Sequence, residues 1–337
     1  MQHYHVVKDF LLENGTTLKE VTIAYHTYGS LNEARNNVIW VCHALTANAD
    51  VQDWWPGMVG ENKLFDASQY FVVCANILGS CYGTTGPTSS NPSTNSAYYD
   101  TFPLITIRDM VNAHRLLCNY LRVSSIELLV GGSMGGYQAL EWSVMEPNPI
   151  KHLFLLATSA KESPRGIAIH TAQRMAIETD ATWRTKSPEA GKQGLKTARA
   201  IGMLTYRSYE AYEKTQAETD YEKVDEFRAS SYIMYQGNKL ANRFTAYSYW
   251  YLTKAMDTHN IARQRGTLEE TLQSVKAKAL VLGITSDLLC PVQEQNFLAE
   301  HIPHATFVSI PSAFGHDGFL LETEAITKAL SEWWKTK

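Results

Sequence analysis

One stretch of the chain, IELLVGGSMGGYQALEW at residues 126–142, limits the possible folds more than any other. A run of strand-forming residues reaches Ser133 through glycines, and further glycines lead into a helical pattern. Residues 131–135 form a G-x-S-x-G motif, and its place between a strand and a helix is the context of a nucleophile elbow. Such a serine needs a tight, strained turn, where flanking side chains would collide with the adjoining strand and helix. The motif therefore predicts an α/β protein with Ser133 as its nucleophile.

The order of the expected elements places this motif in a mostly parallel sheet. Up to about residue 160, apolar runs alternate with helical patterns, which is typical of βαβ units. The runs are apolar throughout, as expected of strands that helices cover on both faces. The expected strands in this part are VTIAYHTYG, NNVIWVCHA, YFVVCANIL, IELLVGG and KHLFLLAT. The expected helices are IRDMVNAHRLLCNYL and GYQALEWSVMEP, the second ending before Pro147.

The character of the sequence changes between about residues 163 and 274. Apolar strand runs disappear, and a segment rich in Ala, Glu, Lys, Arg, Tyr and Gln indicates several helices. The strand pattern then returns with KALVLGI, the helix VQEQNFLAEHI and the strand ATFVSI. We interpret the chain as an α/β core, residues 1–162 and 275–337, interrupted by a helical lid, residues 163–274. The many tyrosines of the lid are expected mainly to pack between helices.

A serine hydroxyl is a weak nucleophile without a base, so the motif needs partners. After a nucleophile elbow the acid and the histidine follow the serine in that order. Asp287 comes directly after the strand KALVLGI, and His316 lies in the glycine-bracketed loop SAFGHDGFL. Alone, Asp287 could cap the helix that starts near Pro291, and His316 could be structural. In sequence with Ser133 they predict a triad, in which Asp287 orients His316 and His316 takes the serine proton.

Two backbone N–H groups are expected to stabilise the negative charge that develops on the substrate oxygen. One belongs to Met134, directly after the nucleophile, and the other to Leu45, in the loop after the strand NNVIWVCHA. His43, in the same loop, is expected to be structural. A phosphate-binding glycine turn is the alternative interpretation of the motif. However, neither G-x-G-x-x-G nor G-x-x-x-x-G-K-[ST] occurs in the chain.

The composition argues against several other classes of protein. The chain has 30 basic and 34 acidic residues, a formal net charge of -4, so nothing points to nucleic acid or an anionic membrane. No apolar run approaches the ~20 residues of a spanning helix, and the first residues show no secretory signal. The 5 cysteines form no C-x-x-C pair, and H-E-x-x-H is absent. We therefore expect a cytoplasmic protein with reduced cysteines and no metal.

These motifs together resemble those of the homoserine O-acetyltransferases, the α/β-hydrolase-fold acyltransferases of methionine biosynthesis. The resemblance is specific, because the matching stretches are long and cover nearly the whole chain. They are CHALTAN, FVVCANILGSCYGTTGPTSSNP, FPLITIRDMV, GGSMGGYQALEW, IGMLTYRS, SYIMYQGNKLANRF, YLTKAMD, SDLLCPVQEQ and GHDGFL. Some positions differ from the family pattern close to the expected pocket and lid. Ala47 replaces a common glycine, and FTAYSY and CPV replace FDANSY and YPP.

The resemblance implies the α/β-hydrolase fold, the triad above, a helical lid, a homodimer formed through lid helices and acetyl-CoA as the acyl donor. It implies no permanently bound cofactor. It also implies that Arg207, in MLTYRS, binds the homoserine carboxylate and that Asp317, in GHDG, pairs with the substrate amine. Several lid cations could face CoA phosphates or only solvent, so no CoA contact is assigned. These cations are Arg165, Arg174, Arg184, Lys186, Lys192 and Arg199.

Other functions stay open at this point. Related enzymes on the same scaffold succinylate homoserine or acylate serine. A carboxylic-ester hydrolase would use the same triad, and thiol release from acetyl-CoA without homoserine would favour it. A non-catalytic binding module would keep the fold, but it would need no exposed, strained serine.

Overall fold

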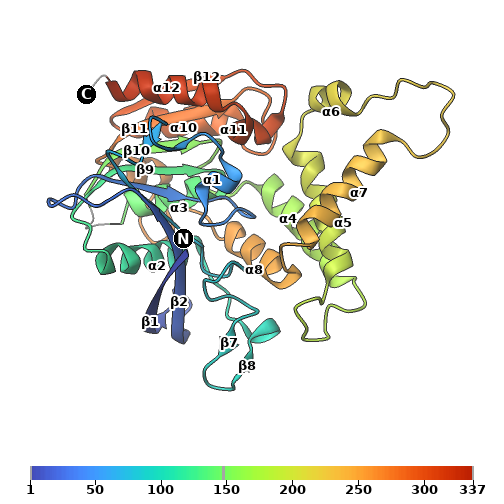
Figure 1. Cartoon of the computed structure of the whole chain (residues 1–337), viewed down its shortest axis with the longest axis horizontal. Coiled ribbons are helices and arrows are strands. Elements are labelled where there is room, and N and C mark those ends of the chain that lie inside the picture. Colours follow the sequence, from blue (N-terminus) through green and yellow to red (C-terminus); the bar gives the residue numbers. More distant parts are fainter. Residues whose placement is uncertain (1, 146–148, 336–337) are drawn as a thin grey trace.

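The computed structural model describes residues 2–145 and 149–335 of the chain, and its centre is an eight-stranded sheet (Figure 1). The strand order is β1-β2-β6-β3-β9-β10-β11-β12. β2 pairs antiparallel with β1 and with β6, and the strands from β6 to β12 run parallel to their neighbours. The strands are β1 (Gln2–Leu11), β2 (Thr17–Tyr28), β3 (Val38–Cys42), β6 (Phe71–Ala75), β9 (Ile126–Gly132), β10 (Ile150–Leu156), β11 (Lys278–Ile284) and β12 (Ala305–Ile310).

The parallel strands from β6 to β11 are largely buried on both faces, which explains why their sequences are mainly apolar. Side chains on successive residues of a strand point to opposite faces, so each strand contributes to two hydrophobic clusters. In β3, Val38 and Trp40 belong to one cluster, whereas Ile39 and Val41 belong to the other. β10 and β11 divide their residues in the same way. The prediction of a mostly parallel, doubly covered sheet is confirmed.

Different helices cover the two faces. One cluster includes residues of α2 (Ile107–Tyr120), α3 (Met134–Ser143) and α10 (Val292–His301), and the other includes residues of α1 (Val51–Trp54) and α12 (Thr323–Lys335). α2 begins at a capping box, in which Thr106 and Asp109 each accept from the other's backbone N–H. The predicted end of α3 at Pro147 lies outside the described residues. Short elements join these parts: β4 (Val59–Gly60), β5 (Phe65–Asp66), β7 (Ser90–Asn91), β8 (Ser96–Ala97), η1 (Tyr99–Thr101), η2 (Gly315–Asp317) and α11 (Gly318–Leu321).

The first strand departs from the sequence prediction. No strand was predicted before VTIAYHTYG, but residues 2–11 pair along β2 from Gln2–His26 to Leu11–Thr17. This strand is half exposed, since only Phe10 is fully buried in it. An edge strand of this kind lacks the continuous apolar run that marked the central strands.

Helices fill the segment predicted as a lid, and several of them project from the core in Figure 1. α5, α6 and α7 lie farthest from the sheet, while α4 and α8 lie between them and the core. α4 begins with Ser163, whose hydroxyl accepts from the N–H of Gly166, and with Pro164 in the first turn. The helices are α4 (Pro164–Glu178), α5 (Lys192–Tyr206), α6 (Tyr209–Gln216), α7 (Arg228–Ala241), α8 (Ala246–Asp257) and α9 (Leu268–Gln273).

The chain rejoins the core before the predicted boundary at residue 274. Asn260 forms a β-bridge with Lys161, on the other side of the insertion. Arg263 then forms a salt bridge with Glu13 of the core, and Arg265 forms one with the buried Glu141. Residues 260–274 therefore contribute to the core side of the molecule. Within the described parts of the chain, no helix is long and apolar enough to span a membrane.

Candidate active site

The turn between β9 and α3 holds Ser133 in a backbone conformation that most residues avoid. Ser133 has φ 54 and ψ -128, and its N–H donates to the carbonyl of Leu156 on β10. A Cβ on Gly131 would lie 2.1 Å from the carbonyl oxygen of Gly135, and a Cβ on Gly135 would lie 2.1 Å from that of Cys42. These distances explain both glycines, because only a residue without a side chain lets strand and helix approach so closely. Such a strained serine is typical of a functional site.

The three residues predicted as a triad form one continuous hydrogen-bonded chain. His316 Nε2 lies 2.8 Å from Ser133 Oγ, and His316 Nδ1 lies 2.6 Å from Asp287 Oδ2. The other oxygen of Asp287 accepts from the N–H groups of Leu289 and Cys290, at 2.8 and 2.9 Å. Asp287 follows β11, and His316 lies in η2 after β12, so parallel strands bring all three residues to the same edge of the sheet.

Burial and charge act in opposite directions on His316, whose side chain is 3% exposed. Burial alone lowers the pKa of its imidazole, but the carboxylate of Asp287 and the hydrogen bond to it raise the pKa above its usual value of 6.5. Since a carboxylate only accepts, Nδ1 carries a proton and neutral His316 presents Nε2 as the acceptor for the serine hydroxyl. This arrangement can remove the proton of Ser133.

The loop after β3 lies beside Ser133, and the buried side chain of His43 forms a hydrogen bond with it. The N–H of Ala47 donates to the carbonyl of Ala44, which also accepts from His43 Nδ1 at 2.9 Å. His43 Nε2 accepts from the N–H of Ile77 at 3.2 Å. Burial lowers the pKa of His43 to about 4, so this ring is neutral and structural, as its sequence position had suggested. His43 thereby fixes the turn that carries Leu45.

The predicted oxyanion donors both lie next to the nucleophile. Met134 is the first residue of α3, where backbone N–H groups have no partner within the helix. Leu45 lines the same pocket as Ser133. The start of α3 also carries the positive end of the helix dipole, which favours negative charge at this point.

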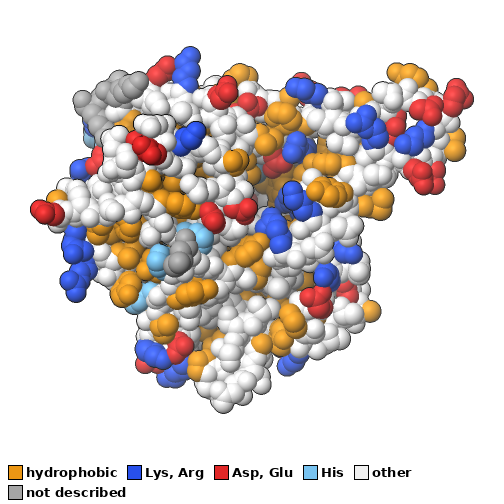
Figure 2. All heavy atoms as spheres, in the orientation of Figure 1, with side chains coloured by type: hydrophobic (Ala, Val, Ile, Leu, Met, Phe, Trp, Pro, Cys, Tyr) orange, Lys and Arg blue, Asp and Glu red, His pale blue; other side chains and the backbone are white. Residues whose placement is uncertain are grey.

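Lid and core together enclose this pocket. Its lid side comes from α4, α5 and α8, and its core side from the loops at the carboxyl ends of the strands. The lining residues are Ala44, Leu45, Thr46, Ser133, Ile169, His170, Gln173, Arg199, Tyr206, Met256, Leu289, His316, Asp317, Phe319 and Leu320. Figure 2 shows hydrophobic and basic side chains gathered along the boundary between the core and the projecting lid.

Only one of the two residues expected to bind the amino-acid ends of a substrate lines the pocket. Asp317 lines the pocket, but Arg207 is not among the lining residues. Instead, Arg207 Nε lies 2.8 Å from Asp317 Oδ2, and its guanidinium lies over the ring of Phe314. Arg207 is therefore placed to orient Asp317.

An arginine other than Arg207 lies at the pocket. Arg199 of α5 lines the pocket, and its Nε atom is buried without a hydrogen-bond partner in the described part of the chain. Its guanidinium lies 5.3 Å from the ring centre of Tyr206, two turns later on the same helix. Nothing in the sequence distinguishes Arg199 from the other lid cations. Only the packing of α5 over the pocket shows that Arg199 lies there.

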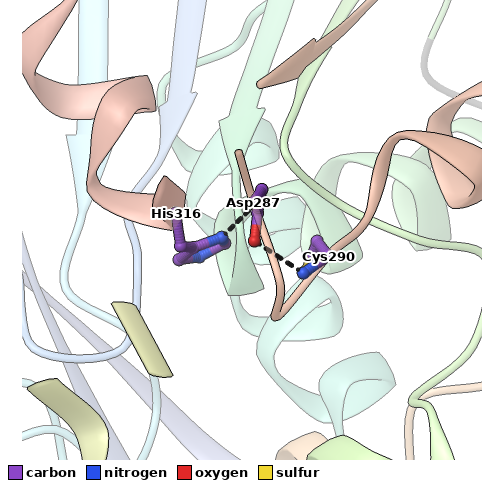
Figure 3. A group of neighbouring side chains, drawn as sticks. All are labelled: Asp287, Cys290 and His316. Atoms are coloured by element: carbon purple, nitrogen blue, oxygen red, sulfur yellow. Dashed lines mark hydrogen bonds and ion pairs between the residues drawn. The ribbon is translucent and has the colours of Figure 1, made fainter. Parts of the chain in front are cut away.

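Cys290 joins Asp287 and His316 in a buried group that could in principle hold a metal ion (Figure 3). Their possible ligand atoms lie within 4.8 Å of one another. However, the bonds from Cys290 N–H and His316 Nδ1 already occupy both oxygens of Asp287. Burial and nearby carboxylates also raise the pKa of the Cys290 thiol well above its usual value, which keeps it a weak ligand. The group serves the hydrogen bonds of the triad residues, and we propose no metal site.

The sheet order, the elbow and the lid define the class of protein. A family model described as alpha/beta hydrolase fold matches residues 37–323, and the chain belongs to that family. Within it, curated relatives narrow the assignment. The homoserine O-acetyltransferase of Cyclobacterium marinum is 47% identical over 323 residues, which cover 96% of this chain and 92% of the relative. That of Chlorobium chlorochromatii is 44% identical over 329 residues, with 96% and 92% covered. The chain is a member of the homoserine O-acetyltransferase family.

Solved structures agree with this placement. The homoserine O-acetyltransferase from Bacillus anthracis matches with a TM-score of 0.91 and 26% identity, covering 98% of this chain and 96% of that one. Esterase E22 matches with a TM-score of 0.87 and 23% identity, covering 98% and 100%. At this lower identity, the likeness to the esterase shows the fold alone.

Proposed function

We propose that this protein transfers an acetyl group to the hydroxyl of L-homoserine, the reaction for which its relatives are named, and that acetyl-CoA is the donor. The observation that carries the proposal is the Ser133–His316–Asp287 chain of hydrogen bonds in a pocket that the lid covers. A nucleophile activated by a base supports an acyl-enzyme mechanism. The names of the relatives support an acetyl group as the group transferred and homoserine as the acceptor.

In the first half of the reaction, His316 takes the proton of Ser133 as the serine oxygen attacks the thioester carbonyl of acetyl-CoA. The N–H groups of Leu45 and Met134 stabilise the negative oxygen of the tetrahedral intermediate. Loss of one such donor typically costs about 3–4 kcal/mol of transition-state stabilisation. The carbon–sulfur bond then breaks, His316 gives its proton to the sulfur, and CoA leaves as the free thiol. Ser133 now carries the acetyl group as an ester.

In the second half, His316 takes the proton of the homoserine hydroxyl as its oxygen attacks the acetyl ester. The intermediate collapses, Ser133 regains a proton from His316, and O-acetyl-L-homoserine leaves. Water at ~55 M competes with the acceptor, so the enzyme must orient the acceptor well. Good orientation is worth roughly 7–11 kcal/mol, which is enough for a bound alcohol to win. The lid over the pocket supports this requirement because it limits the entry of water.

Arg199 and Asp317 are our candidates for binding the acceptor. Arg199 brings an unpaired buried Nε atom to the pocket, within the part of the chain that the structure describes, and a guanidinium suits a carboxylate. Asp317 follows the catalytic histidine and lines the pocket, where its carboxylate can accept from an ammonium group. Arg207 holds Asp317 through their salt bridge and acts through it.

Release of free thiol from acetyl-CoA, measured with and without homoserine, tests the proposed activity. A transferase releases thiol in steady state only when homoserine is present, and mass spectrometry then finds O-acetylhomoserine. Serine as acceptor and succinyl-CoA as donor, offered in the same assay, decide between the related acyl transfers. Steady thiol release independent of any acceptor would make the protein a hydrolase and would contradict the proposal.

We also propose that two copies associate through the lid. The lid carries large hydrophobic side chains that are exposed in the single chain, and Figure 2 shows such side chains among charged ones on the projecting part. They are Ile167, Met175, Leu204, Tyr209, Tyr221, Val224, Phe227, Met234 and Tyr235. Sedimentation velocity should give a dimer, and Met234→Glu with Tyr235→Glu should give a monomer. A wild-type protein that sediments as a monomer at micromolar concentration would contradict this.

A further inference from the structure

A second histidine faces the pocket that contains Ser133 and His316. His170 lies on α4, its side chain is 4% exposed, and it lines the pocket. Its neighbours on α4, Ile169 and Gln173, line the pocket as well. This face of α4 therefore covers the pocket from the lid side. The reaction as described above gives His170 no role.

An aspartate and an arginine hold the ring of His170. His170 Nδ1 lies 2.9 Å from Asp257 Oδ1 at the end of α8, and Arg174 Nη2 lies 2.7 Å from Asp257 Oδ2. Because a carboxylate only accepts hydrogen bonds, Nδ1 of His170 must carry a proton. Arg174 and His170 thus hold the two oxygens of Asp257 from different sides. With Nδ1 as the donor, Nε2 is the nitrogen that accepts a hydrogen bond in the neutral form of an imidazole.

This acceptor is unused in the protein itself. Nε2 of His170 has no hydrogen-bond partner among the residues that the structure describes. The other buried carboxyl nearby, Glu162, is engaged with the hydroxyl of Tyr137 at 3.1 Å and the N–H of Ser163 at 2.9 Å. The His170 side chain is buried and lines the pocket, so a ligand bound there can supply the donor that Nε2 lacks.

We propose that His170 Nε2 accepts a hydrogen bond from the ammonium group of the amino-acid acceptor, which makes His170 a specificity residue for α-amino acids. This inference rests on the proposed acetyl transfer to homoserine. An ammonium group offers three N–H donors, and Arg207 already occupies one oxygen of Asp317, so a further acceptor is needed.

The position of Arg199 supports the same assignment. α4 and α5 pack against each other, and each contributes residues to the lid side of the pocket. If Arg199 binds the carboxylate, the ammonium group on the same carbon atom must lie close by. His170 then accepts from the ammonium group on the lid side, and Asp317 accepts from it on the core side.

Fragments of homoserine separate this role from a structural one. γ-Hydroxybutyrate keeps the carboxylate but lacks the ammonium group, and propanolamine keeps the ammonium group but lacks the carboxylate. For His170→Phe, we expect KM for homoserine and the inhibition constant of propanolamine to rise about 10- to 100-fold, as for a lost bond to a charged donor. The inhibition constant of γ-hydroxybutyrate should change less than about threefold, because its binding does not use that bond. His170→Gln, whose side-chain oxygen can accept, should recover part of the loss.

Two controls accompany these measurements. Thermal unfolding shows whether each variant is folded, and His301→Gln, on α10 away from the pocket, is a matched substitution outside the site. An equal rise for both fragments would overturn the proposal, because a distorted pocket would weaken both. A larger rise for γ-hydroxybutyrate would also overturn it and would make His170 a carboxylate ligand. If His170→Phe does not fold, His170→Leu, which also lacks an acceptor, takes its place, and constants identical to wild type for all three ligands would overturn the proposal. Failure of the wild-type protein to acetylate homoserine would instead refute the proposed function.

Discussion

The Nε2 atom of His316 lies 2.8 Å from the hydroxyl oxygen of Ser133, although 183 residues separate them in the sequence. Each side chain is held independently: Ser133 by the turn after β9, and His316 by the carboxylate of Asp287 after β11. A catalytic arrangement that is fixed in advance needs no reorganisation during the reaction.

Removing the Ser133 hydroxyl should abolish acyl transfer. Ser133→Ala is expected to lower the rate of homoserine-dependent thiol release by at least about a thousandfold, because no other group can form the ester. Ser143→Ala, at the far end of α3, is the control and should keep wild-type activity. If Ser133→Ala retained more than a tenth of the wild-type rate, the nucleophile would lie elsewhere.

Replacing Asp287 should change both the rate and its pH dependence. His316 acts as a base only when neutral, and since its pKa is raised, the wild-type rate should fall as pH drops through a value above 6.5. In Asp287→Asn the burial that lowers the pKa remains, while the charge that raises it is gone. The acid limb of kcat/KM should therefore move to lower pH, and the maximal rate should fall about ten-thousandfold through loss of the correct tautomer. An acid limb that stays in place would disconnect Asp287 from His316.

Substitutions of Arg199, within α5, and of Arg207, at the C-terminal end of α5, should affect homoserine binding differently. Arg199→Gln is expected to raise KM for homoserine about 10- to 100-fold, since it removes the cation in the pocket. Arg207→Gln should raise it less than about tenfold, because it removes only the salt bridge that orients Asp317, worth about 1 kcal/mol. Steady-state kinetics of both variants at saturating acetyl-CoA provide the comparison. The opposite order of effects would restore Arg207 as the carboxylate ligand.

A methyl group at the elbow should disrupt the fold locally. In Gly131→Ala the new Cβ would meet the carbonyl oxygen of Gly135 at 2.1 Å, so backbone must move, at a cost of about 3 kcal/mol or more. Gly57→Ala is the comparison. Gly57 has φ +86, but no atom lies within 4 Å of the position that its new methyl group would take. Backbone strain alone then costs about 1 kcal/mol. Urea unfolding should show this difference in the free energy of unfolding. Equal stabilities of the two variants would contradict the crowding argument.

The sequence predicted the core of the fold well because the central strands are covered on both faces. Runs such as KALVLGI and IELLVGG match β11 and β9 residue for residue. The half-exposed edge strand β1 was missed for the opposite reason, since most of its residues face solvent. The end of the insertion was also set too late, because ion pairs between Arg263 and Glu13 and between Arg265 and Glu141 leave no local pattern in the sequence.

The site residues that could be predicted were likewise those with a local pattern in the sequence. Ser133, Asp287 and His316 could be named because the elbow has a local motif and its partners follow strands in a known order. The pocket residues of the lid could not, since helix packing rather than local pattern decides whether Arg199, Arg207 or His170 faces the nucleophile. Resemblance to the family led to Arg207, and the packing of α5 points to Arg199 instead.

The most direct test of the whole account is mass spectrometry of the protein after mixing with acetyl-CoA in the absence of an acceptor. We predict one added acetyl group, located on the peptide that contains Ser133, which persists until L-homoserine is added and then appears as O-acetyl-L-homoserine. An acetyl group on another residue, or one that is lost to water equally fast with and without homoserine, would contradict it.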